Sequence, residues 1–465
     1  MRLHNTLTHQ VEEFNPINEQ MVRIYSCGPT VYEHAHIGNL SAYIFADTLH
    51  RVLEFNNYDV HHVMNYTDVD DKTIKRSQTI DKPPLEALRQ LTDKYIDLFL
   101  NDMALIGNDA AVLDFQRATD HINDMQALIT RLYNGGFAYL ADDGVYFSIE
   151  AYQKAGKTYG QLLKITADNT SNQRIQNDEY DKASVHDFAL WKKSKPSEPA
   201  WSFKIGDASI DGRPGWHIEC SAMSETSLEI PFDIHTGGVD LIFPHHENEI
   251  AQSTALLSQP TMAKWFIHNE HVLIEGKKMA KSASNFYTLQ DVISKKFDPM
   301  AFRLLILQAH YRSQVHFSWE LLKASQNRLT SFRQWADLRF QTFKSAELAK
   351  FYEQSFKEID EQLSDDLKTP TALAIINRMI DSVEELGIDT ESITKAIKLI
   401  DSLFGLKLGQ NDDINEKQKE VIIKRQTARE TQDWLIADKL RKELLEEGVV
   451  VRDTAQGTVW SRVYS

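Results

Sequence analysis

The chain has 465 residues, of which 42% are hydrophobic and 25% are charged, and this balance excludes disordered, collagen-like and coiled-coil proteins. A formal net charge of −16 argues against a protein that coats nucleic acid without regard to sequence, although a local basic patch can still bind RNA. No apolar run reaches the roughly 18 residues of a membrane-spanning helix, and residues 1–6 lack the start of a signal peptide, so we expect a cytoplasmic protein with no membrane contact.

The N-terminal part predicts a strand, a helix and a second strand. Residues 21–26 alternate apolar and polar side chains, as a half-buried strand does. Residues 39–55 predict a helix with Asn39 as its N-cap, and its apolar face contains Leu40, Ile44, Leu49, Val52 and Leu53. Residues 59–64 predict the next strand. This order indicates an α/β fold with a parallel sheet.

Further along the chain the pattern changes several times. Residues 80–135 predict helices, and residues 135–214 combine strand-like pieces with polar turns, which indicates an insertion into the sheet domain. Residues 302–405 have a nearly continuous helical pattern. A polar stretch at residues 409–413 separates them from a last small unit.

Four side chains far apart in the sequence could form a metal site. Cys27 and Cys220, the two cysteines of the chain, exclude a disulfide scaffold, and each taken alone is predicted to be a small buried residue. Cys27 follows the first strand, where ligands of open parallel sheets bind. His245 and Glu249 are four residues apart on a predicted helix, so they share one face. Two thiolates, an imidazole and a carboxylate suit zinc. The alternative is a helix start rich in His and Glu, because no CxxC pair is present.

Two other segments have the composition of phosphate-binding loops. Residues 34–39, His-Ala-His-Ile-Gly-Asn, precede the first helix, where backbone N–H groups bind phosphate and Gly38 permits close approach of a nucleotide. Residues 276–282, Gly-Lys-Lys-Met-Ala-Lys-Ser, contain Lys278 and Lys281, which could neutralise charge in phosphoryl or adenylyl chemistry. Taken alone, a loop with histidines and a lysine-rich surface loop are the simpler interpretations.

The order and spacing of these segments resemble a known family. A His-Ile-Gly motif after the first strand, followed about 240 residues later by Lys-Met-x-Lys-Ser, resembles the two signatures of class I aminoacyl-tRNA synthetases. Longer blocks at residues 27–32, 65–72, 212–223 and 243–253 resemble the cysteinyl-tRNA synthetases in particular. The resemblance extends from about residue 20 to the C-terminus.

The resemblance implies one zinc ion per chain at the floor of an amino-acid pocket, held by Cys27, Cys220, His245 and Glu249. The thiol of L-cysteine would complete the coordination, and the preference of zinc for a thiolate would reject serine without an editing domain.

The same resemblance implies further residues of the amino-acid pocket. Thr67 and Trp216 would line it, and His235 and Asp240 would lie near it. From the residues alone, Trp216 could equally be a packed core aromatic and Asp240 an N-cap.

The two signatures would bind ATP with Mg²⁺. Gly38 would pack against the nucleotide, and His36, Asn39, Lys278 and Lys281 would stabilise charge as the cysteine carboxylate attacks the α-phosphorus and pyrophosphate leaves. The acyl group would then pass to the 2′-hydroxyl of the terminal adenosine of tRNA(Cys).

Two positions depart from the class signatures. Asn39 replaces a histidine, a variant that the cysteine family uses, and Ala280 replaces a serine. We still expect activity, because Lys281 and Ser282 remain.

The C-terminal half is similar to the tRNA-binding parts of the family. Residues 424–442 contain six Lys/Arg and three acids, a local balance of +3. We expect tRNA contacts from Arg429, Trp434, Asp438 and Asp453. Trp434 could stack on an unpaired base, and a core Trp on an amphipathic helix is the alternative.

The resemblance therefore predicts an α/β protein with a Rossmann-like parallel-sheet catalytic domain that carries an insertion, followed by a helical bundle and a small C-terminal anticodon-binding domain. We place the two halves of the catalytic domain at residues 1–115 and 215–300, with the insertion between them at residues 116–214. The helical bundle follows at residues 301–405 and the anticodon-binding domain at residues 406–465. We also expect a monomer.

Two other functions share some of these motifs. A ligase that joins cysteine to a small-molecule amine would use the same adenylate, but the anticodon-like block argues against it. A tRNA-binding protein with an inactive site is disfavoured by the intact metal and ATP motifs.

Overall fold

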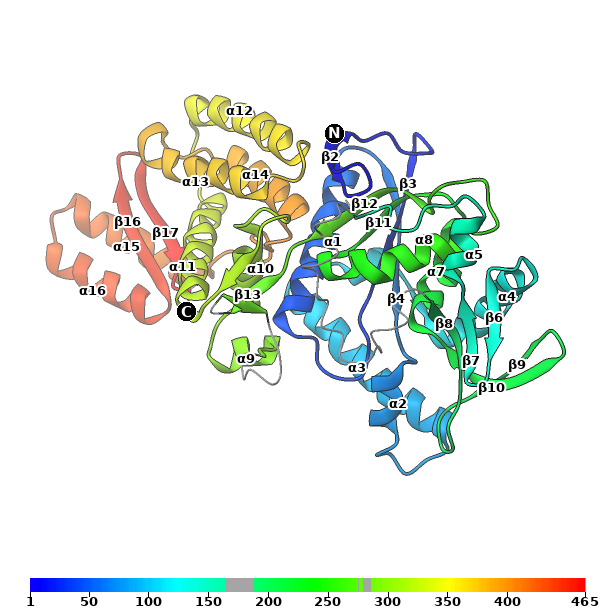
Figure 1. The fold of residues 1–465 in the computed structure, drawn as a ribbon. Helices are drawn as coiled ribbons and strands as arrows, with labels where there is room; N and C mark the ends of the chain where they lie inside the picture. Colours follow the sequence, from blue (N-terminus) through cyan, green and yellow to red (C-terminus); the bar gives the residue numbers. More distant parts are fainter. Residues whose placement is uncertain (164–186, 275, 279–285, 465) are drawn as a thin grey trace.

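A five-stranded parallel sheet forms the centre of the first half of the molecule (Figure 1). The structure is a computed structural model that describes residues 1–163, 187–274, 276–278 and 286–464. The strands lie in the order β12 (Ala263–Asn269), β11 (Phe232–Gly238), β3 (Met21–Ser26), β4 (Asp59–Tyr66) and β5 (Leu113–Arg117). Every neighbouring pair is parallel. The strand order reverses at β3, and the carboxyl end of a strand at such a point is where open α/β sheets bind ligands.

Helices cover both faces of this sheet. α1 (Ile37–Phe55) joins β3 to β4, and α7 (Trp216–Leu228) precedes β11. Ile24 of β3 belongs to the same hydrophobic core as α1, whereas the next residue, Tyr25, belongs to the core that contains Ile218 of α7. Because successive strand residues point to opposite faces, α1 and α7 lie on opposite sides of the sheet. The predicted Rossmann-like α/β fold is confirmed.

The start of α1 differs from the prediction. The helix begins at Ile37, its N-cap is His36, and Asn39 occupies the third helical position. The Nδ1 atom of His36 accepts a hydrogen bond from the Asn39 backbone N–H at 3.1 Å, and the Asn39 side chain accepts one from the His36 backbone. Asn39 is therefore not the N-cap, because the imidazole supplies the acceptor instead. The five predicted apolar side chains of α1 are all fully buried.

The prediction of helices across residues 80–135 is partly wrong. The helices α3 (Pro84–Leu105) and α4 (Ile122–Asn134) are separated by β5, the edge strand of the sheet. Only Leu113 and Phe115 give β5 an apolar alternation, so a strand of five residues between two long helices leaves a weak signal. Residues 59–64 do form a strand, which continues to Tyr66.

The strand-like insertion folds as a second sheet, antiparallel throughout, at one end of the molecule (Figure 1). The helix α5 (Ile149–Lys154) lies within the insertion. The strands lie in the order β6 (Ala138–Ala141), β7 (Gly144–Phe147), β8 (Phe188–Lys193), β10 (Ala208–Pro214) and β9 (Trp201–Ile205).

Three shorter groups of elements complete the sheet half. A hairpin of β1 (Arg2–Asn5) and β2 (Gln10–Glu13) packs beside β12. The helix α2 (Asp71–Ser77) follows β4, and α8 (Glu247–Thr254) joins β11 to β12. A small sheet contains β14 (Lys277–Lys278), β13 (Val272–Ile274) and β15 (Val315–Phe317).

Helices dominate the second half, as predicted. The short α9 (Leu289–Ser294) and α10 (Pro299–Leu307) lead into a bundle of α11 (Trp319–Ala336), α12 (Ala346–Leu363), α13 (Thr369–Leu386) and α14 (Thr390–Phe404). The strand β15 interrupts this helical region. The last unit contains α15 (Glu416–Glu430), α16 (Trp434–Glu446), β16 (Val449–Thr454) and β17 (Gly457–Arg462).

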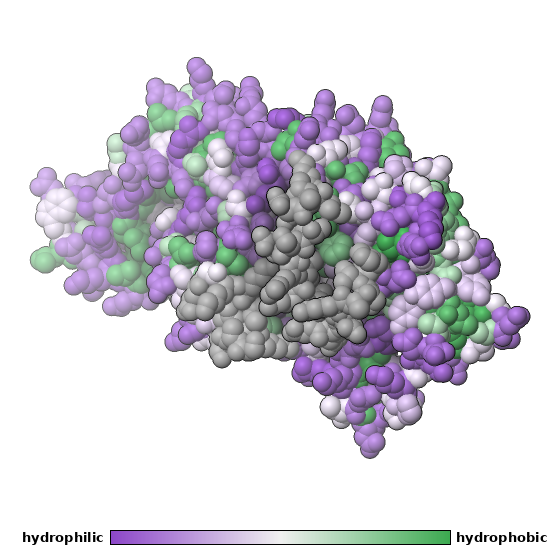
Figure 2. Space-filling view, in the orientation of Figure 1, coloured by the Kyte–Doolittle hydropathy of each residue, from purple (hydrophilic) through white to green (hydrophobic). Residues whose placement is uncertain are grey.

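The C-terminal unit lies at the opposite end of the molecule from the antiparallel sheet, beyond the bundle (Figure 1). It has a small hydrophobic core of its own that includes Leu444, Val451 and Trp460. Hydrophilic residues predominate on the bundle and on this unit in the face shown in Figure 2. Among the described residues, every helix is too short or too polar to cross a bilayer.

Candidate functional site

The four predicted metal ligands come together at the carboxyl end of β3. One ligand atom each from Cys27, Cys220, His245 and Glu249 lies within 4.8 Å of the other three. Cys27 follows β3 at the point where the strand order reverses, and Cys220 comes from α7. His245 and Glu249 lie one helical turn apart where a short helical segment continues into α8. Cys27 is half-buried and the other three are buried.

The electrostatics of this cluster suit a divalent cation. Burial raises the pKa of Glu249, but the charges of His245 and His235 outweigh it and lower the pKa to about 2. Burial lowers the pKa of His245, whereas Glu249 and Cys220 raise it to about 10. A hydrogen bond from Cys27 lowers the pKa of Cys220 to about 6. These directions favour a carboxylate at Glu249 and a thiolate at Cys220, two anionic ligands for a divalent cation, and His245 would give up its proton to bind the same ion.

One oxygen of Glu249 supports the assignment of a metal. Oε1 is buried and has no directed hydrogen bond among the described residues, although Nε2 of His245 lies 2.7 Å away. A zinc ion between these two side chains would bind both of them in place of the proton on His245. The residues present therefore fit a zinc ion: two sulfurs, one imidazole nitrogen and one carboxylate oxygen.

A second set of side chains overlaps the first. Cys27, His235, His246 and Glu249 also offer ligand atoms within 4.8 Å of one another. His235 is fully buried, and its Nδ1 donates to the Tyr25 carbonyl at 3.0 Å while its Nε2 contacts Glu249. His235, predicted near the amino-acid pocket, thus lies behind Glu249 and orients that carboxylate.

The sequence reasoning missed three histidines of this region, His217, His246 and His268. The Nδ1 atom of His246 lies 2.8 Å from Nε2 of His268, and Nδ1 of His217 lies 2.8 Å from Nδ1 of His245. His217 and His246 were close to the recognised motifs in the sequence, because each is within three residues of a predicted ligand. Their adjacency to Cys220 and His245 was the signal that could have found them.

A cavity of about 440 Å³ joins the metal cluster to the first signature. Cys27, Trp216 and Asp240 line it together with His36, Gly38 and Asn39. A volume of this size accommodates a small-molecule ligand. One predicted zinc ligand, Cys27, and the first signature therefore face one space.

Trp216 and Asp240 are not the structural residues of the alternative interpretations. Trp216 is 40% exposed and stacks on the His245 ring with a centroid distance of 4.2 Å, so it is not a packed core aromatic. Asp240 lies inside a short helical turn whose N-cap is Gly238, so it is not an N-cap.

Thr67 lies behind the wall of the cavity and is absent from its lining. It is buried, its backbone N–H donates to the Pro29 carbonyl at 3.0 Å, and its hydroxyl accepts from Asn65 at 3.1 Å. At Gly28 an added Cβ would lie 1.7 Å from the Asn65 carbonyl oxygen, so only glycine permits this approach of the loop to β4. Thr67 and Gly28 thus fix the path of the loop that begins with Cys27.

The segment after the second signature lies against the first signature. His36 forms an isolated antiparallel bridge with Thr288, and the Ile37 N–H donates to the Tyr287 carbonyl at 2.9 Å. Lys278 belongs to β14, which pairs with β13. Lys281 and Ala280 lie outside the described residues. The described segment that follows the second motif therefore lies next to the first motif.

Known protein families match both ends of this arrangement. The sequence model for "tRNA synthetases class I (C) catalytic domain" matches residues 13–327, and that for "Cysteinyl-tRNA ligase anticodon binding domain" matches residues 411–460. The cysteine–tRNA ligases of Solibacter usitatus and Thermococcus gammatolerans are each 38% identical to this chain. The alignments cover 99% of both chains in the first case, and 100% of this chain and 99% of the relative in the second. This chain belongs to the cysteine–tRNA ligase family.

Solved structures of other class I synthetases share the fold of this family member. A Mycobacterium tuberculosis methionyl-tRNA synthetase bound by methionyl-adenylate matches with a TM-score of 0.60 at 13% identity, covering 84% of this chain and 93% of the other. A putative arginyl-tRNA synthetase from Campylobacter jejuni gives 0.56 at 12% identity, covering 85% and 94%. At these identities the likeness concerns the fold alone.

The residues expected to contact tRNA lie in the part that matches the family's anticodon-binding domain. Trp434 is 55% exposed at the start of α16, and the Arg429 guanidinium lies over its ring, 5.5 Å from the centroid. The core interpretation of Trp434 is therefore wrong. Asp438 is exposed on α16. Asp453 of β16 accepts hydrogen bonds from both terminal nitrogens of the buried Arg425 and lies 3.2 Å from Arg429, so it holds this surface together.

Proposed function

We propose that this chain activates L-cysteine with ATP to form cysteinyl-adenylate. It then transfers the cysteinyl group to the 3′-terminal adenosine of tRNA(Cys) and releases AMP and pyrophosphate. The observation that carries the proposal is the shared cavity: Cys27 of the metal cluster and His36 of the first signature line the same space. Cysteine bound by its thiol at one end would present its carboxylate to a nucleotide at the other.

The cluster of Cys27, Cys220, His245 and Glu249 would hold one zinc ion per chain. When bound, zinc would supply a soft Lewis-acid contact that favours a thiolate over the hydroxyl of serine. Trp216, stacked on His245, would close the side of the amino-acid pocket, and His235 would keep the Glu249 carboxylate in place. Asp240, which also lines the cavity, would accept from the ammonium group of the substrate.

The adenylate-forming step would depend on charge stabilisation around the polyphosphate. A helix of 19 residues presents its positive end beside Gly38, where the Ile37 and Asn39 N–H groups are already bonded to Tyr287 and His36. His36 and Asn39 lie at this end, and Lys278 and Lys281 would approach from the second signature with Mg²⁺ on the polyphosphate. The carboxylate of cysteine attacks the α-phosphorus in this arrangement, so no covalent enzyme intermediate is needed.

Recognition of tRNA would fall to the C-terminal unit. Trp434 offers an exposed aromatic face for an unpaired base, and Arg429 adds a cation beside it. Asp438 would accept from a base edge, whereas Asp453 would act mainly by holding Arg425 and Arg429 in place. The match to an anticodon-binding domain over residues 411–460 disfavours a ligase for a small-molecule amine, which would not need this unit.

We also propose that the protein acts in the cytoplasm as a monomer. The described structure contains two free cysteines, which suit a reducing compartment. Light scattering coupled to size exclusion would test the monomer, and a mass twice that of the chain would contradict it.

Two assays on the purified chain test the function. The first measures cysteine-dependent exchange of pyrophosphate into ATP, with serine as the matched control substrate, and the second measures charging of tRNA(Cys). We expect both reactions with cysteine. A lack of exchange would exclude the proposed reaction, and exchange without charging would favour the small-molecule amine ligase.

A further inference from the structure

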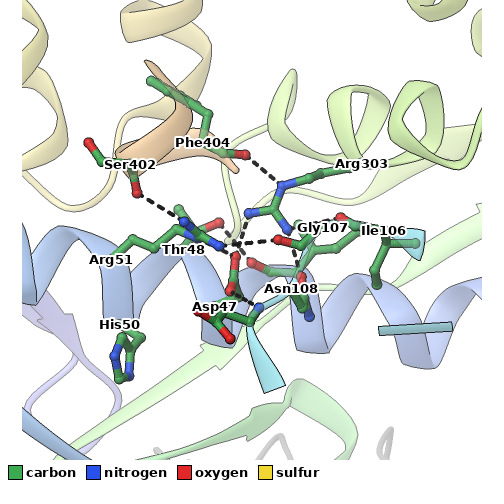
Figure 3. A network of polar contacts seen from close by, with 12 residues as sticks. Asp47, Thr48, His50, Arg51, Ile106, Gly107, Asn108, Arg303, Ser402 and Phe404 are labelled. Carbon is green, nitrogen blue, oxygen red and sulfur yellow. Dashed lines mark hydrogen bonds and ion pairs between the residues drawn. The ribbon is translucent and has the colours of Figure 1, made fainter. Parts of the chain in front are cut away.

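A buried network of charged side chains joins the sheet domain to the helical bundle (Figure 3). Its centre is Arg303 of α10, which is fully buried. Nη2 of Arg303 donates to Asp47 of α1 at 2.5 Å, Nε donates to the Phe404 carbonyl at the end of α14 at 2.6 Å, and Nη1 donates to Asn108 at 2.6 Å. Three segments far apart in the sequence therefore meet on one guanidinium.

A second arginine reinforces the same junction (Figure 3). Arg51, one turn after Asp47 on α1, donates from Nε to that carboxylate at 2.7 Å. Its Nη1 donates to the Ser402 carbonyl at 3.2 Å and to the Asp401 carbonyl at 3.3 Å. The last carbonyls of a helix have no partners within the helix and carry its negative end. Two arginines thus bind the C-terminal end of α14 to α1.

The backbone at this junction leaves room for nothing larger than glycine. Gly107 and Gly405 both have positive φ, at +79° and +58°. An added Cβ on Gly405 would lie 2.8 Å from Nη2 of Arg303, and one on Gly107 would lie 2.6 Å from the Gly405 carbonyl oxygen. The Arg303 side chain therefore packs directly against the backbone at the end of α14, at a distance that a side chain on Gly405 would obstruct.

The C-terminal unit is fixed to the bundle just as closely. Asp337, at the end of α11, is fully buried and accepts from the Arg462 backbone N–H at 2.8 Å and from its Nη1 at 2.6 Å. The Gln341 amide exchanges hydrogen bonds of 2.9 and 3.1 Å with the backbone of Trp460. Arg339 donates to the Leu408 and Asn411 carbonyls in the segment after α14. The C-terminal unit is therefore held by the segment that follows α11, and that segment in turn packs against α14.

We propose that Arg51, Arg303 and Asp47 are positioning residues that fix the tRNA-reading end of the molecule relative to the active-site cavity. The inference rests on the proposed function. The N-cap of α1, His36, lines the cavity, and the same helix carries Asp47 and Arg51 further along, so one helix connects the cavity to the junction. A tRNA that is held at the C-terminal unit then presents its 3′ end to the cavity in one register. Loosening the junction impairs acyl transfer to tRNA and leaves cysteine activation intact.

The first test variant is Arg51→Met. The Arg51 side chain is 17% exposed and lies at the edge of the network. Methionine keeps most of the packed stem and removes the hydrogen bonds to α14. The matched control is Arg378→Met, which breaks a pair with Glu358 between two helices within the bundle. Arg303→Lys is the second variant, which keeps the charge and loses the forked donors.

Each variant is assayed in three ways on the full chain. Pyrophosphate exchange measures activation, anisotropy measures the Kd for tRNA(Cys), and charging kinetics are measured with native tRNA and with tRNA in which one anticodon base is changed. We expect Arg51→Met to leave exchange within about twofold and the Kd unchanged, and to lower kcat for charging about tenfold, the scale of a typical coupling between sites. We expect the preference for the native anticodon in charging to fall together with kcat. Arg51→Lys should retain part of the kcat that Arg51→Met loses.

Several results would overturn the inference. One is that Arg51→Met loses exchange and charging equally and has a lower Tm. Another is that Arg51→Met keeps the anticodon preference of the unmodified chain. A third is that the control Arg378→Met shows the same loss of charging as Arg51→Met. If Arg303→Lys and Arg51→Met both fail to fold, the network is only structural and the inference also fails. Failure of exchange in the unmodified chain would instead refute the proposed function, so the two failures are distinguishable.

Discussion

The metal cluster and the junction network both bury several charged groups, but the partners of these groups are arranged differently in the two regions. At the junction each of the three guanidinium nitrogens of Arg303 donates to an oxygen, and Asp47 accepts from two arginines and from a backbone N–H. In the cluster, Glu249 pairs with His245 and His235, and sulfur, nitrogen and oxygen ligand atoms lie within 4.8 Å of one another. Burial of charge therefore does not by itself mark a binding site, whereas the convergence of metal-ligand atoms from separate elements indicates one.

The largest effect is expected from Cys27→Ser, which would break the cluster while keeping its shape. Serine is a poor ligand for zinc in such a set, so we expect most of the zinc to be lost. Without the metal, the preference for cysteine over serine should fall from about 10⁴ or more to about 10² or less, the range that a pocket achieves without such a contact. Metal analysis and pyrophosphate exchange with both amino acids measure this.

Two companion variants make the test of the cluster specific. Ser26→Ala alters the preceding residue, whose hydroxyl bonds His62 at 2.7 Å on the other face of β3, and it should retain zinc and selectivity. Cys220→Ser separates the two overlapping ligand sets, because Cys220 belongs only to the set with His245. Full zinc content in Cys220→Ser would assign the ion to His235 and His246 instead.

A smaller effect, on stability rather than chemistry, is expected at the junction from Asp47→Asn. Removing one charge of a buried pair leaves the arginines uncompensated, so we expect a loss of about 3 kcal/mol in the free energy of unfolding at pH 7. Burial raises the pKa of Asp47, but Arg303 and Arg51 outweigh it and hold the pKa below its ordinary value. The wild-type advantage is therefore complete above the unfolded pKa of about 3.9 and is lost as the pH falls further through the lower native pKa.

Urea unfolding of the wild-type protein and of Asp47→Asn, from neutral pH to about pH 3.5, measures the difference in their free energies of unfolding over the range in which an ordinary Asp titrates. The gap between the two curves should be constant near neutrality and narrow at the acid end. A gap that is already absent at pH 7 would show that the network contributes no stability through the Asp47 charge.

The sequence predicts these two regions unequally for physical reasons. Cys27, Cys220, His245 and Glu249 lie in local blocks that resemble those of a known family, so the sequence could predict that they come together, as the structure shows. Arg303 and Asp47 are 256 residues apart on ordinary helices, and their pairing depends on how α10 crosses α1, which no local pattern contains.

Local errors have equally local causes. The cap of α1 was assigned to Asn39 because amides are common caps, whereas the structure uses the His36 imidazole. The strand β5 was missed because it is short and lies at the sheet edge, where pairing with β4 and not its own pattern specifies it. The parallel sheet and the bundle follow from long periodic segments, which is the strongest signal a sequence offers.

The smallest effect is expected in the C-terminal unit, where the residues proposed to bind tRNA are exposed in the free protein. Replacing Trp434 by Ala should weaken tRNA binding by about 1–3 kcal/mol, the usual value of one base stacked on an aromatic ring. The free energy of unfolding should hardly change, because this ring is 55% exposed. In the described structure Arg429 is its one aromatic or cationic contact. Trp460→Ala is the matched control: this Trp is 6% exposed and stacks on Phe340, so its loss should lower stability instead. Anisotropy with tRNA(Cys) and thermal unfolding of both variants separate the two roles, and a Trp434 variant that loses stability but binds tRNA normally would place this residue with the structural aromatics.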